Sequence, residues 1–568
     1  MKPSNYGKAF FTIMAVCLFA TFSAYAQVGT TSLHGTVTDK TGASVSGAKV
    51  SLDNLGQAVH RELQTGASGE YEFLALPPGT YALTIEKAGF RKFERKNLQL
   101  LVNSPATANA TLELGSTSET IEVSAQAAAL NTSDASLGIA FNEHQVKELP
   151  MDGRNVPDLL SLQAGVVYTG NRSDINTDID TRSGSVNGAR SDQSNITLDG
   201  VDVNTSGGYA FTAALPVTLD SVQEFRVTTT NYNADQGASS GAQVSLITKS
   251  GSNKFHGSAY EYNRNTYTSA NDYFIKQSQL QAGEPNKPPK LIRNIFGGSV
   301  GGPFVKDRLF FFMNYEEARQ REENAALRIV PTASLRDGVV LYPCDVPSSC
   351  PGGSVQGLSG ASYAVPAGSA GLSPNNLATM DPLHVGPNSA MIAYFNTFPL
   401  PNDNTQGDGL GFDYSGFRFK GPIQKNYRYY IARADYKLTS SGNHSIFWRG
   451  ALSNFANLGV PSYPGKTSEH TIVNFNKGFA LGYTAILRST LINNFRWGFT
   501  RESIGDVGDS NEQWIFFRGL SQRITRTRSF QRPLHNFSDD LSWVRGKHTF
   551  QFGGGLAFIR NPDRKSVV

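Results

Sequence analysis

Beyond residue 252, apolar and polar residues alternate in segments of about ten residues, the length that a tilted membrane strand needs. In NYRYYIARADYKLT, one face of an extended strand carries Tyr430 and Tyr436, and the other carries Arg433 and Asp435. FRWGFTR and HTFQFGGGLAF repeat the pattern with aromatic residues. Strands that are apolar toward lipid and polar toward water can cross a membrane only in a barrel, where every backbone group is paired. The pattern predicts a partial antiparallel transmembrane β-barrel over residues 252–568, with a soluble β-sandwich as the alternative.

The connections between these strands differ greatly in length, which favours the barrel. Ser440-Ser441-Gly442-Asn443 is a short turn of the periplasmic type, whereas the segment around 330–421 is long and rich in Pro, Gly and Ser, like an extracellular loop. That loop carries Cys344 and Cys350. In an oxidising compartment we expect them to form a disulfide, with two free thiols as the alternative.

The N-terminus and the charge balance limit the class of protein. Residues 1–26 match a secretory signal peptide, because Lys2 and Lys8 precede the apolar core Ala9 to Phe22 and Ala24-Tyr25-Ala26 gives the small-x-small cleavage pattern. After this segment no run of about 18 apolar residues exists, so no transmembrane helix is expected. A net charge of +4 over 568 residues provides no electrostatic case for nucleic acid.

Residues 31–114 alternate with period two between Gly- and Pro-containing turns, which predicts a small sandwich of short antiparallel strands. The segment resembles the carboxypeptidase-regulatory-like, or transthyretin-like, domain. The resemblance rests on Gly35-x-Val37-x-Asp39 and on Gly69-x-Tyr71-x-Phe73 followed by Pro78-Gly79-x-Tyr81. It implies no peptidase activity, and His34 and His60 lack partners at a zinc-ligand spacing.

Residues 126–251 show mixed signals: a short helix around Leu159, a strand Ile196-Thr197-Leu198 running into the turn Asp199-Gly200, and strands near 225–229 and 243–248. This α+β segment resembles the plug domain of TonB-dependent outer-membrane receptors of the Oar-like group. The matching motifs are Leu149-Pro150 with Gly153-Arg154-Asn155, then Leu198-Asp199-Gly200-Val201, Gln223-Glu224-Phe225-Arg226-Val227, and Thr248-Lys249-Ser250-Gly251. From them we take Arg154, Asn155, Asp199, Gly200, Glu224 and Phe225 as candidate plug residues.

The linker 115–125 between these modules contains the acidic, β-branched stretch ETIEVSA. An extended segment can add to the edge of a partner's sheet. In composition and position it resembles the TonB box, which implies contact with a TonB-type energy-coupling protein in the periplasm. The candidate contact residues are Glu119, Thr120, Ile121, Glu122, Val123, Ser124 and Ala125. The alternative is a final strand of the sandwich.

The chain is shorter than the receptors it resembles. At roughly 25 residues per strand, residues 252–568 hold about a dozen strands, fewer than the 22 of plugged transporters. Arg564-Lys565-Ser566-Val567-Val568 also lacks the terminal aromatic strand of this family. We interpret the chain as a truncated receptor, with a compact barrel of about 10 to 14 strands as the alternative.

The expected function follows from the resemblance, since no catalytic motif competes with it. We expect no enzyme activity, cofactor or metal site, and we expect acidic residues on lumen strands to be solvated. The segment Asp174 to Asp180 alternates like the start of a calcium-binding loop, but Ile179 and Ser185 stand where such a loop has Gly and Glu, so we expect a solvated polar loop there. The resemblance implies a receptor in the outer membrane of a Gram-negative bacterium, in contact with its lipid, which imports a bulky glycan, peptide or metal chelate. A surface adhesion or structural protein, and a secreted carbohydrate-active β-protein, are the alternatives.

Overall fold

The computed structural model describes residues 29–560, except 55, 58, 116–119, 125–130, 132–134, 150, 152–153, 155, 169–183, 191–192, 205–214, 216, 234–235, 237–239, 282, 284, 409–410, 469, 509–527 and 547. The predicted signal peptide, residues 1–26, lies outside these residues. So does the segment Asp174 to Asp180, which was compared with a calcium-binding loop. Among the described residues, no helix has the length and apolarity to cross a membrane. The same residues contain no cluster of three or more metal-ligating side chains.

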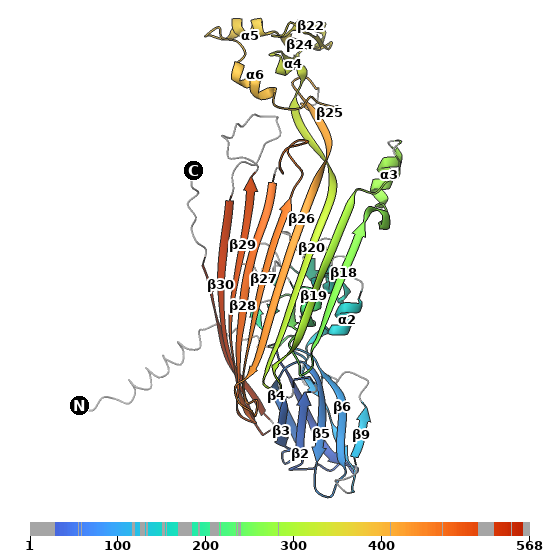
Figure 1. Cartoon of the computed structure of the whole chain (residues 1–568), viewed down its shortest axis with the longest axis vertical. Coiled ribbons are helices and arrows are strands. Elements are labelled where there is room, and N and C mark those ends of the chain that lie inside the picture. The colour runs from blue at the N-terminus through green and yellow to red at the C-terminus, as the bar shows by residue number, and fades with distance from the viewer. Residues whose placement is uncertain are drawn as a thin grey trace, which may run out of the picture.

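A curved antiparallel sheet forms the long body of the molecule, and we call it the wall (Figure 1). Its strands follow one another in chain order, with β18 and β31 at the two ends of the sheet. The wall strands are β18 (His256–Asn265), β19 (Leu291–Val305), β20 (Leu309–Pro331), β26 (Tyr414–Lys437), β27 (His444–Leu458), β28 (His470–Arg488), β29 (Leu491–Gly508), β30 (Arg528–Arg545) and β31 (His548–Ile559), and β25 (Asp403–Gly407) pairs with β26. The predicted alternation is confirmed in β26, where Tyr430 is exposed and the side chain of Arg433, on the other face, is only 13% exposed.

The described part of the chain contributes ten strands to this sheet, these nine wall strands and the short β25, where a spacing of about 25 residues per strand predicts about a dozen. Two facts explain the difference. Strands β20 and β26 are 23 and 24 residues long, close to the whole length assumed for a strand with its loop. The connection between them, residues 332–413, forms a separate loop region and contributes only β25 to the wall.

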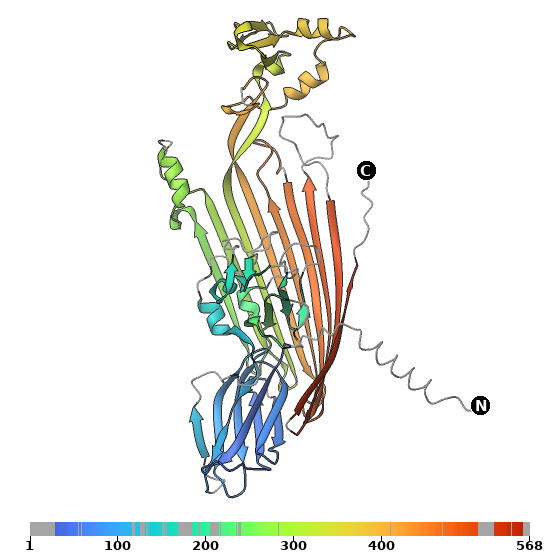
Figure 2. The ribbon, with the colours of Figure 1, turned by 180° about the vertical axis from the view of Figure 1, so that it is seen from behind.

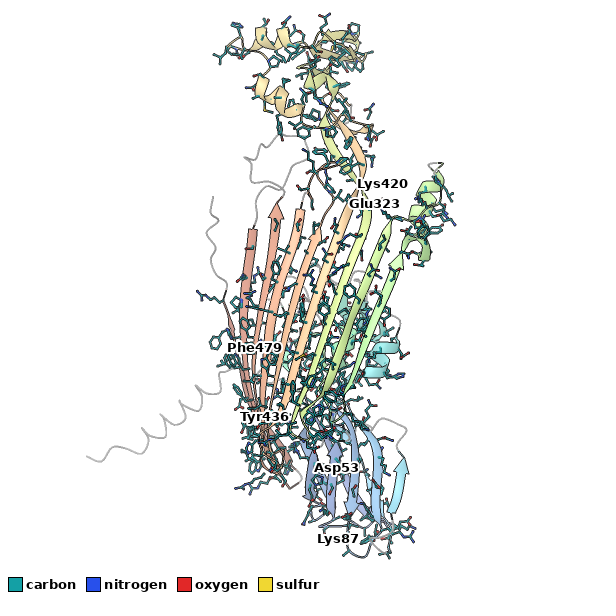
Figure 3. The ribbon with its side chains drawn as sticks, viewed as in Figure 1. Asp53, Lys87, Glu323, Lys420, Tyr436 and Phe479 are labelled. Atoms are coloured by element: carbon teal, nitrogen blue, oxygen red, sulfur yellow. A yellow bond between two sulfur atoms is a disulfide. The ribbon has the colours of Figure 1, made fainter. Side chains whose placement is uncertain are left out.

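The loop region stands beyond one end of the wall (Figure 1). It contains α4 (Ala333–Arg336), β21 (Val340–Pro343), η5 (Pro347–Ser349), β22 (Gly353–Gln356), β23 (Ser362–Val365), β24 (Ser369–Leu372), α5 (Pro374–Met380) and α6 (Ser389–Phe395). A disulfide joins Cys344 and Cys350 beside η5. At the same end of the wall, η4 (Thr266–Thr268) and α3 (Tyr273–Gln281) connect β18 to β19. Figure 3 places Glu323 and Lys420 toward this end and Tyr436 at the other, beside the sandwich.

The sandwich lies at the opposite end, next to the short turn after β26. One sheet has the order β4-β1-β7, with β8 also on β1, and the other has the order β3-β2-β5-β6-β9. The strands are β1 (Thr31–Asp39), β2 (Lys49–Asn54), β3 (His60–Gln64), β4 (Glu70–Leu76), β5 (Gly79–Glu86), β6 (Lys92–Leu100), β7 (Ala106–Thr107), β8 (Ala110–Leu112) and β9 (Thr120–Ser124). Leu33, Leu52, Tyr81 and Leu83 are buried between the sheets, because alternate residues of each strand point inward.

A third module, which we call the plug, lies against one face of the wall (Figure 2). Its main sheet has the order β10-β16-β17-β14-β15 and a smaller sheet joins β11, β12 and β13. The elements are β10 (Leu137–Asn142), α2 (Glu143–Glu148), η1 (Val156–Leu162), β11 (Val166–Tyr168), β12 (Gly184–Val186), β13 (Ala189–Arg190), β14 (Asn195–Leu198), β15 (Val201–Asp202), η3 (Leu219–Ser221), β16 (Val222–Thr230) and β17 (Gln243–Thr248). The predicted strands near 196–198, 225–229 and 243–248 are β14, β16 and β17.

Candidate functional site

The plug contacts the wall through the turn between β14 and β15. Asp199 and Gly200 occupy this turn with positive φ of 53° and 78°, the backbone of a two-residue hairpin turn, which Asp and Gly tolerate best. Within the plug, the Asp199 carboxylate accepts hydrogen bonds from the backbone N–H of Thr248 at 2.9 Å and from its hydroxyl at 3.0 Å. The carboxylate is therefore held in one orientation, and its side chain is only 2% exposed.

Two arginines of the wall bind the same carboxylate. Arg433 Nη1 donates to Asp199 Oδ1 at 3.1 Å, and Arg449 Nε donates to Oδ2 at 3.1 Å. Arg433 of β26 and Arg449 of β27 are directly opposite in the register of the two strands, so both side chains leave the same face of the wall. Two buried like charges at such a position repel unless an anion lies between them. We call Asp199, Arg433 and Arg449 the Asp199 cluster.

A second ion-pair cluster lies at Arg154, one of the candidate plug residues. Its guanidinium donates to Asp220 of the plug at 2.7 Å and to Glu316 of β20 at 3.3 Å. The ring of Tyr260 lies 4.7 Å from this guanidinium, and the Tyr260 hydroxyl donates to Glu316 at 2.7 Å. Burial acts against the charge of Arg154, but the neighbouring Glu316, Tyr260 and Asp220 outweigh it and raise its pKa. The Arg154 cluster thus joins plug to wall by charge as well.

Glycines of the wall admit apolar side chains of the plug. A Cβ added at Gly498 of β29 would lie 2.0 Å from Val201 Cγ1, and one added at Gly478 of β28 would lie 2.5 Å from Leu215 Cδ1. Both distances are far below van der Waals contact. The plug therefore fits against the wall at these two points only because the wall lacks side chains there.

The sandwich contacts the plug through backbone and side-chain groups. Glu224 of β16 accepts a hydrogen bond from the Val102 N–H at 2.7 Å, and Arg226 of the same strand donates to the Val102 carbonyl at 3.1 Å. Asn103 adds a hydrogen bond to Ser245 at 2.9 Å. Burial raises the pKa of Glu224 to about 8, although the Val102 N–H and Arg226 oppose the shift. The candidate residue Glu224 therefore lies at the boundary between sandwich and plug.

The segment that resembles a TonB box is a strand in this structure. Strand β9 pairs in parallel with β6, from Lys92↔Thr120 to Lys96↔Ser124, and it is the last strand of its sheet. The linker interpretation is therefore corrected for 120–124, where the alternative of a final sandwich strand describes the structure. The reason is that a period-two segment with β-branched residues finds an unpaired edge beside it. Glu119 and Ala125 lie outside the described residues.

The remaining candidate residues have different positions. Phe225 is 0% exposed and packs in the plug core, with its ring centroid 5.8 Å from that of Phe141. Asn155 lies outside the described residues. The expectation of solvated acidic residues in the wall is wrong for Glu316, which is 1% exposed, because Arg154 and Tyr260 neutralise and hydrogen-bond it. Sequence reasoning missed Arg449; inward-facing arginines at opposite register positions were the available signal.

Comparisons with known proteins agree with this architecture. A family model described as "Outer membrane beta barrel domain" matches residues 247–566, and one described as "Carboxypeptidase regulatory-like domain" matches residues 32–113. The "TonB-dependent transporter Oar" of Myxococcus xanthus is 25% identical over 334 residues, which is 56% of this chain and 30% of that protein. The chain thus spans less than a third of the length of this curated relative. The similarity confirms the resemblance to the Oar-like group.

Solved structures were also found. The outer membrane transporter YddB from Escherichia coli has a TM-score of 0.44 at 11% identity, over 74% of this chain and 48% of that chain. The siderophore receptor PirA from Acinetobacter baumannii has a TM-score of 0.34 at 13% identity, over 74% and 58%. The family assignment rests instead on the outer-membrane model, which covers more than half of the chain. The chain belongs to the outer membrane beta barrel family and is a protein of the Gram-negative outer membrane.

Proposed function

We propose that this chain is part of a TonB-dependent receptor, which imports a bulky glycan, peptide or metal chelate by energised displacement of the plug. The observation that carries the proposal is the way the plug is held. Its contacts with the wall include two ion-pair clusters, at Asp199 and at Arg154. Ion pairs exchange for water when they separate, so a plug held by them can leave and return.

The position of β9 suggests how an energy-coupling protein in the periplasm could exert a pulling force on the plug. Among the described residues the strand has a neighbour on one side only, so a partner strand can add to its open edge or replace β6 by backbone hydrogen bonds. The chain that follows leads to β10, an edge strand of the plug sheet, which pairs with β16 and with no other strand of the described part of the chain. A pull on residues 120–124 would therefore reach the plug at a strand held by a single ladder.

The test replaces Val123 with proline in the full receptor, and Val123→Ala is the matched control. Proline removes a backbone N–H and disfavours a strand interior, whereas alanine keeps the backbone intact. Cells are grown on glycans, peptides or metal chelates as sole nutrient source, and energy-dependent uptake and surface binding are measured. We expect Val123→Pro to abolish uptake and leave surface binding intact, while Val123→Ala retains both.

Full uptake by the proline variant would exclude this route. The alternative of a surface adhesion or structural protein gives the opposite pattern. Such a protein would tolerate Val123→Pro and would lose cell attachment on removal of the loop region, residues 332–413. The loop region favours this alternative in one respect, since it stands beyond the wall and contains a small loop closed by the Cys344–Cys350 disulfide.

A further inference from the structure

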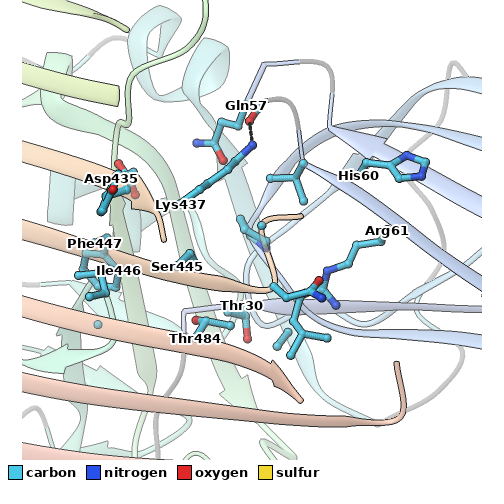
Figure 4. Close-up of a pocket in the computed structure, with 18 of the residues that line it drawn as sticks. Thr30, Gln57, His60, Arg61, Asp435, Lys437, Ser445, Ile446, Phe447 and Thr484 are labelled. Atoms are coloured by element: carbon cyan, nitrogen blue, oxygen red, sulfur yellow. Dashed lines mark hydrogen bonds between the residues drawn. The ribbon is translucent and has the colours of Figure 1, made fainter. Parts of the chain in front are cut away.

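A cleft of about 630 Å³ opens where the sandwich, the plug and the adjacent end of the wall meet (Figure 4). Arg61 lines it from the sandwich, Ile247 from the plug, and Lys437, Phe447 and Arg496 from the wall. Its volume lies within the usual range for small-molecule sites, roughly 300–1,000 Å³. The cleft is distinct from the β9 edge and does not depend on the transport function.

The charge of the cleft is unbalanced. Five basic residues line it against three acidic ones, and two of the acidic residues, Asp199 and Asp435, already bind Arg433. Lys437 donates to the Gln57 carbonyl at 2.9 Å, which the dashed line in Figure 4 marks. The residues that line the cleft therefore include two more basic than acidic side chains.

Two guanidinium groups have free donors there. Within the described part of the chain, the Arg61 side chain forms no hydrogen bond or ion pair, and burial lowers its pKa to about 10 despite the opposing influence of Tyr81. Arg496 is 6% exposed, and its buried Nε has no hydrogen-bond partner among the described residues. Its guanidinium instead lies 4.9 Å from the ring centroid of Phe447. Buried donors without acceptors are costly, so an anion that accepts from them stabilises the site.

The walls of the cleft are apolar between these charges. Phe73, Ile247, Phe310 and Phe447 line it. Apolar walls add nothing to the binding of a small inorganic ion, but they favour a ligand with a hydrocarbon or aromatic body. The planar guanidinium fork matches a carboxylate in geometry. We propose that this cleft binds an organic carboxylate, with its anionic group toward Arg61 and Arg496 and its apolar part against the aromatic walls.

Isothermal titration calorimetry on the purified full chain in detergent micelles tests the proposal with sodium benzoate as the probe. Benzamide serves as the uncharged analogue of the same shape, and inorganic phosphate as an anion without an apolar body. We expect saturable binding of benzoate, and at least about tenfold weaker binding of benzamide and of phosphate. Benzamide lacks the negative charge that the guanidinium groups bind, and phosphate lacks the apolar body that packs against the aromatic walls.

Arg61→Gln should weaken benzoate binding by about tenfold or more, since it removes one guanidinium. Arg91→Gln makes the same change in the same module outside the cleft and should leave binding unchanged, because Arg91 faces Glu113. Lys437→Gln is a second variant, should Arg61→Gln fail to fold. Three results would overturn the proposal: no saturable benzoate binding up to about 10 mM, phosphate binding without benzoate binding, or equal benzoate affinity in the wild type and in the folded cleft variants.

Discussion

Asp199 joins the plug to the wall through a buried carboxylate. Its carboxylate is the anion between Arg433 and Arg449, and the Arg449 side chain is 0% exposed. Removal of one partner from a buried ion pair leaves an uncompensated charge, which typically costs about 3–5 kcal/mol. We therefore expect Asp199→Asn to lower the free energy of unfolding by that order, measured by denaturant unfolding in micelles.

The control for this variant is Asp202→Asn. Asp202 is a neighbouring acid whose hydrogen bonds come from Asn204 and not from an arginine. It should change stability much less, since no guanidinium loses its partner. Equal destabilisation by the two variants would mean that the charge of Asp199 is not what holds the plug turn to the wall.

Glu224 makes the contact between sandwich and plug dependent on pH. Burial raises its pKa from 4.5 to about 8 in the folded chain. The folded state therefore binds a proton that the unfolded state has released, so stability is greatest below about pH 4.5 and falls until about pH 8. The exchange protection of the Val102 amide, corrected for intrinsic rate, should be lower at pH 8.5 than at pH 5.5.

Glu224→Gln should remove this difference, because the amide oxygen still accepts from Val102 and carries no charge. The Val37 amide, bonded to Gly69 within the sandwich at 2.8 Å, reports changes unrelated to Glu224. If wild type and Glu224→Gln lose the same protection between the two pH values, the assignment of the pH effect to Glu224 is wrong.

For single residues, the sequence predicted which residues are important better than it predicted which residues they contact. Alternation placed Arg433 on the inward face, and the plug motifs singled out Asp199, Arg154 and Glu224. The sequence could not join them, because Asp199 and Arg449 are 250 positions apart and no local pattern links such residues. Glu224 binds a backbone N–H, which has no side-chain signature in the sandwich.

Among the elements, strand β29 of the wall contacts the plug closely at Gly498, where the absence of a side chain leaves room for Val201. Gly498→Ala places a Cβ 2.0 Å from Val201 Cγ1, so the plug must shift or the strand must bend. Overpacking of this kind typically costs about 1–3 kcal/mol. We expect a lower thermal midpoint for Gly498→Ala, and recovery when Val201→Ala is added.

Gly554→Ala in β31 is the matched control, because a Cβ added there meets no atom within 4 Å among the described residues. It makes the same chemical change in another wall strand. A thermal midpoint equally reduced in both variants would point to an effect of alanine on strand formation and not to the contact between plug and wall.

Element prediction succeeded where the period was clear. The strand predicted at 243–248 is β17 with the same bounds, and Asp199-Gly200 forms the predicted turn. Segment 120–124 was ambiguous for a physical reason: an extended, β-branched sequence suits a free peptide and an edge strand equally well. Sequence spacing also does not show how long each strand is: β20 and β26, of 23 and 24 residues, extend past the ends of the neighbouring wall strands toward the loop region (Figure 1).

At the scale of the whole molecule, the three modules and the loop region follow one axis (Figures 1 and 2). The loop region lies at one end, the wall with its plug in the middle, and the sandwich at the other end beside the turn after β26. The difference in connection length predicted the two ends of the wall. The position of the sandwich could not be predicted from the sequence, since several of its contacts use backbone groups such as the Val102 N–H and the Gln57 carbonyl, which have no sequence signature.

The central claim is that the plug must move away from the wall for uptake to occur. A disulfide between the two tests it directly, because an added Cβ at Gly498 lies 3.0 Å from Val201 Cβ. This is about 0.5 Å shorter than the lower end of the range for disulfides, so a small separation of the two backbones allows the bond to form. Energy-dependent uptake is measured in cells whose receptor carries Val201→Cys and Gly498→Cys, before and after reduction, with each single variant as control. The account predicts no uptake while the bond is formed and recovery after reduction; undiminished uptake with the bond intact would contradict it.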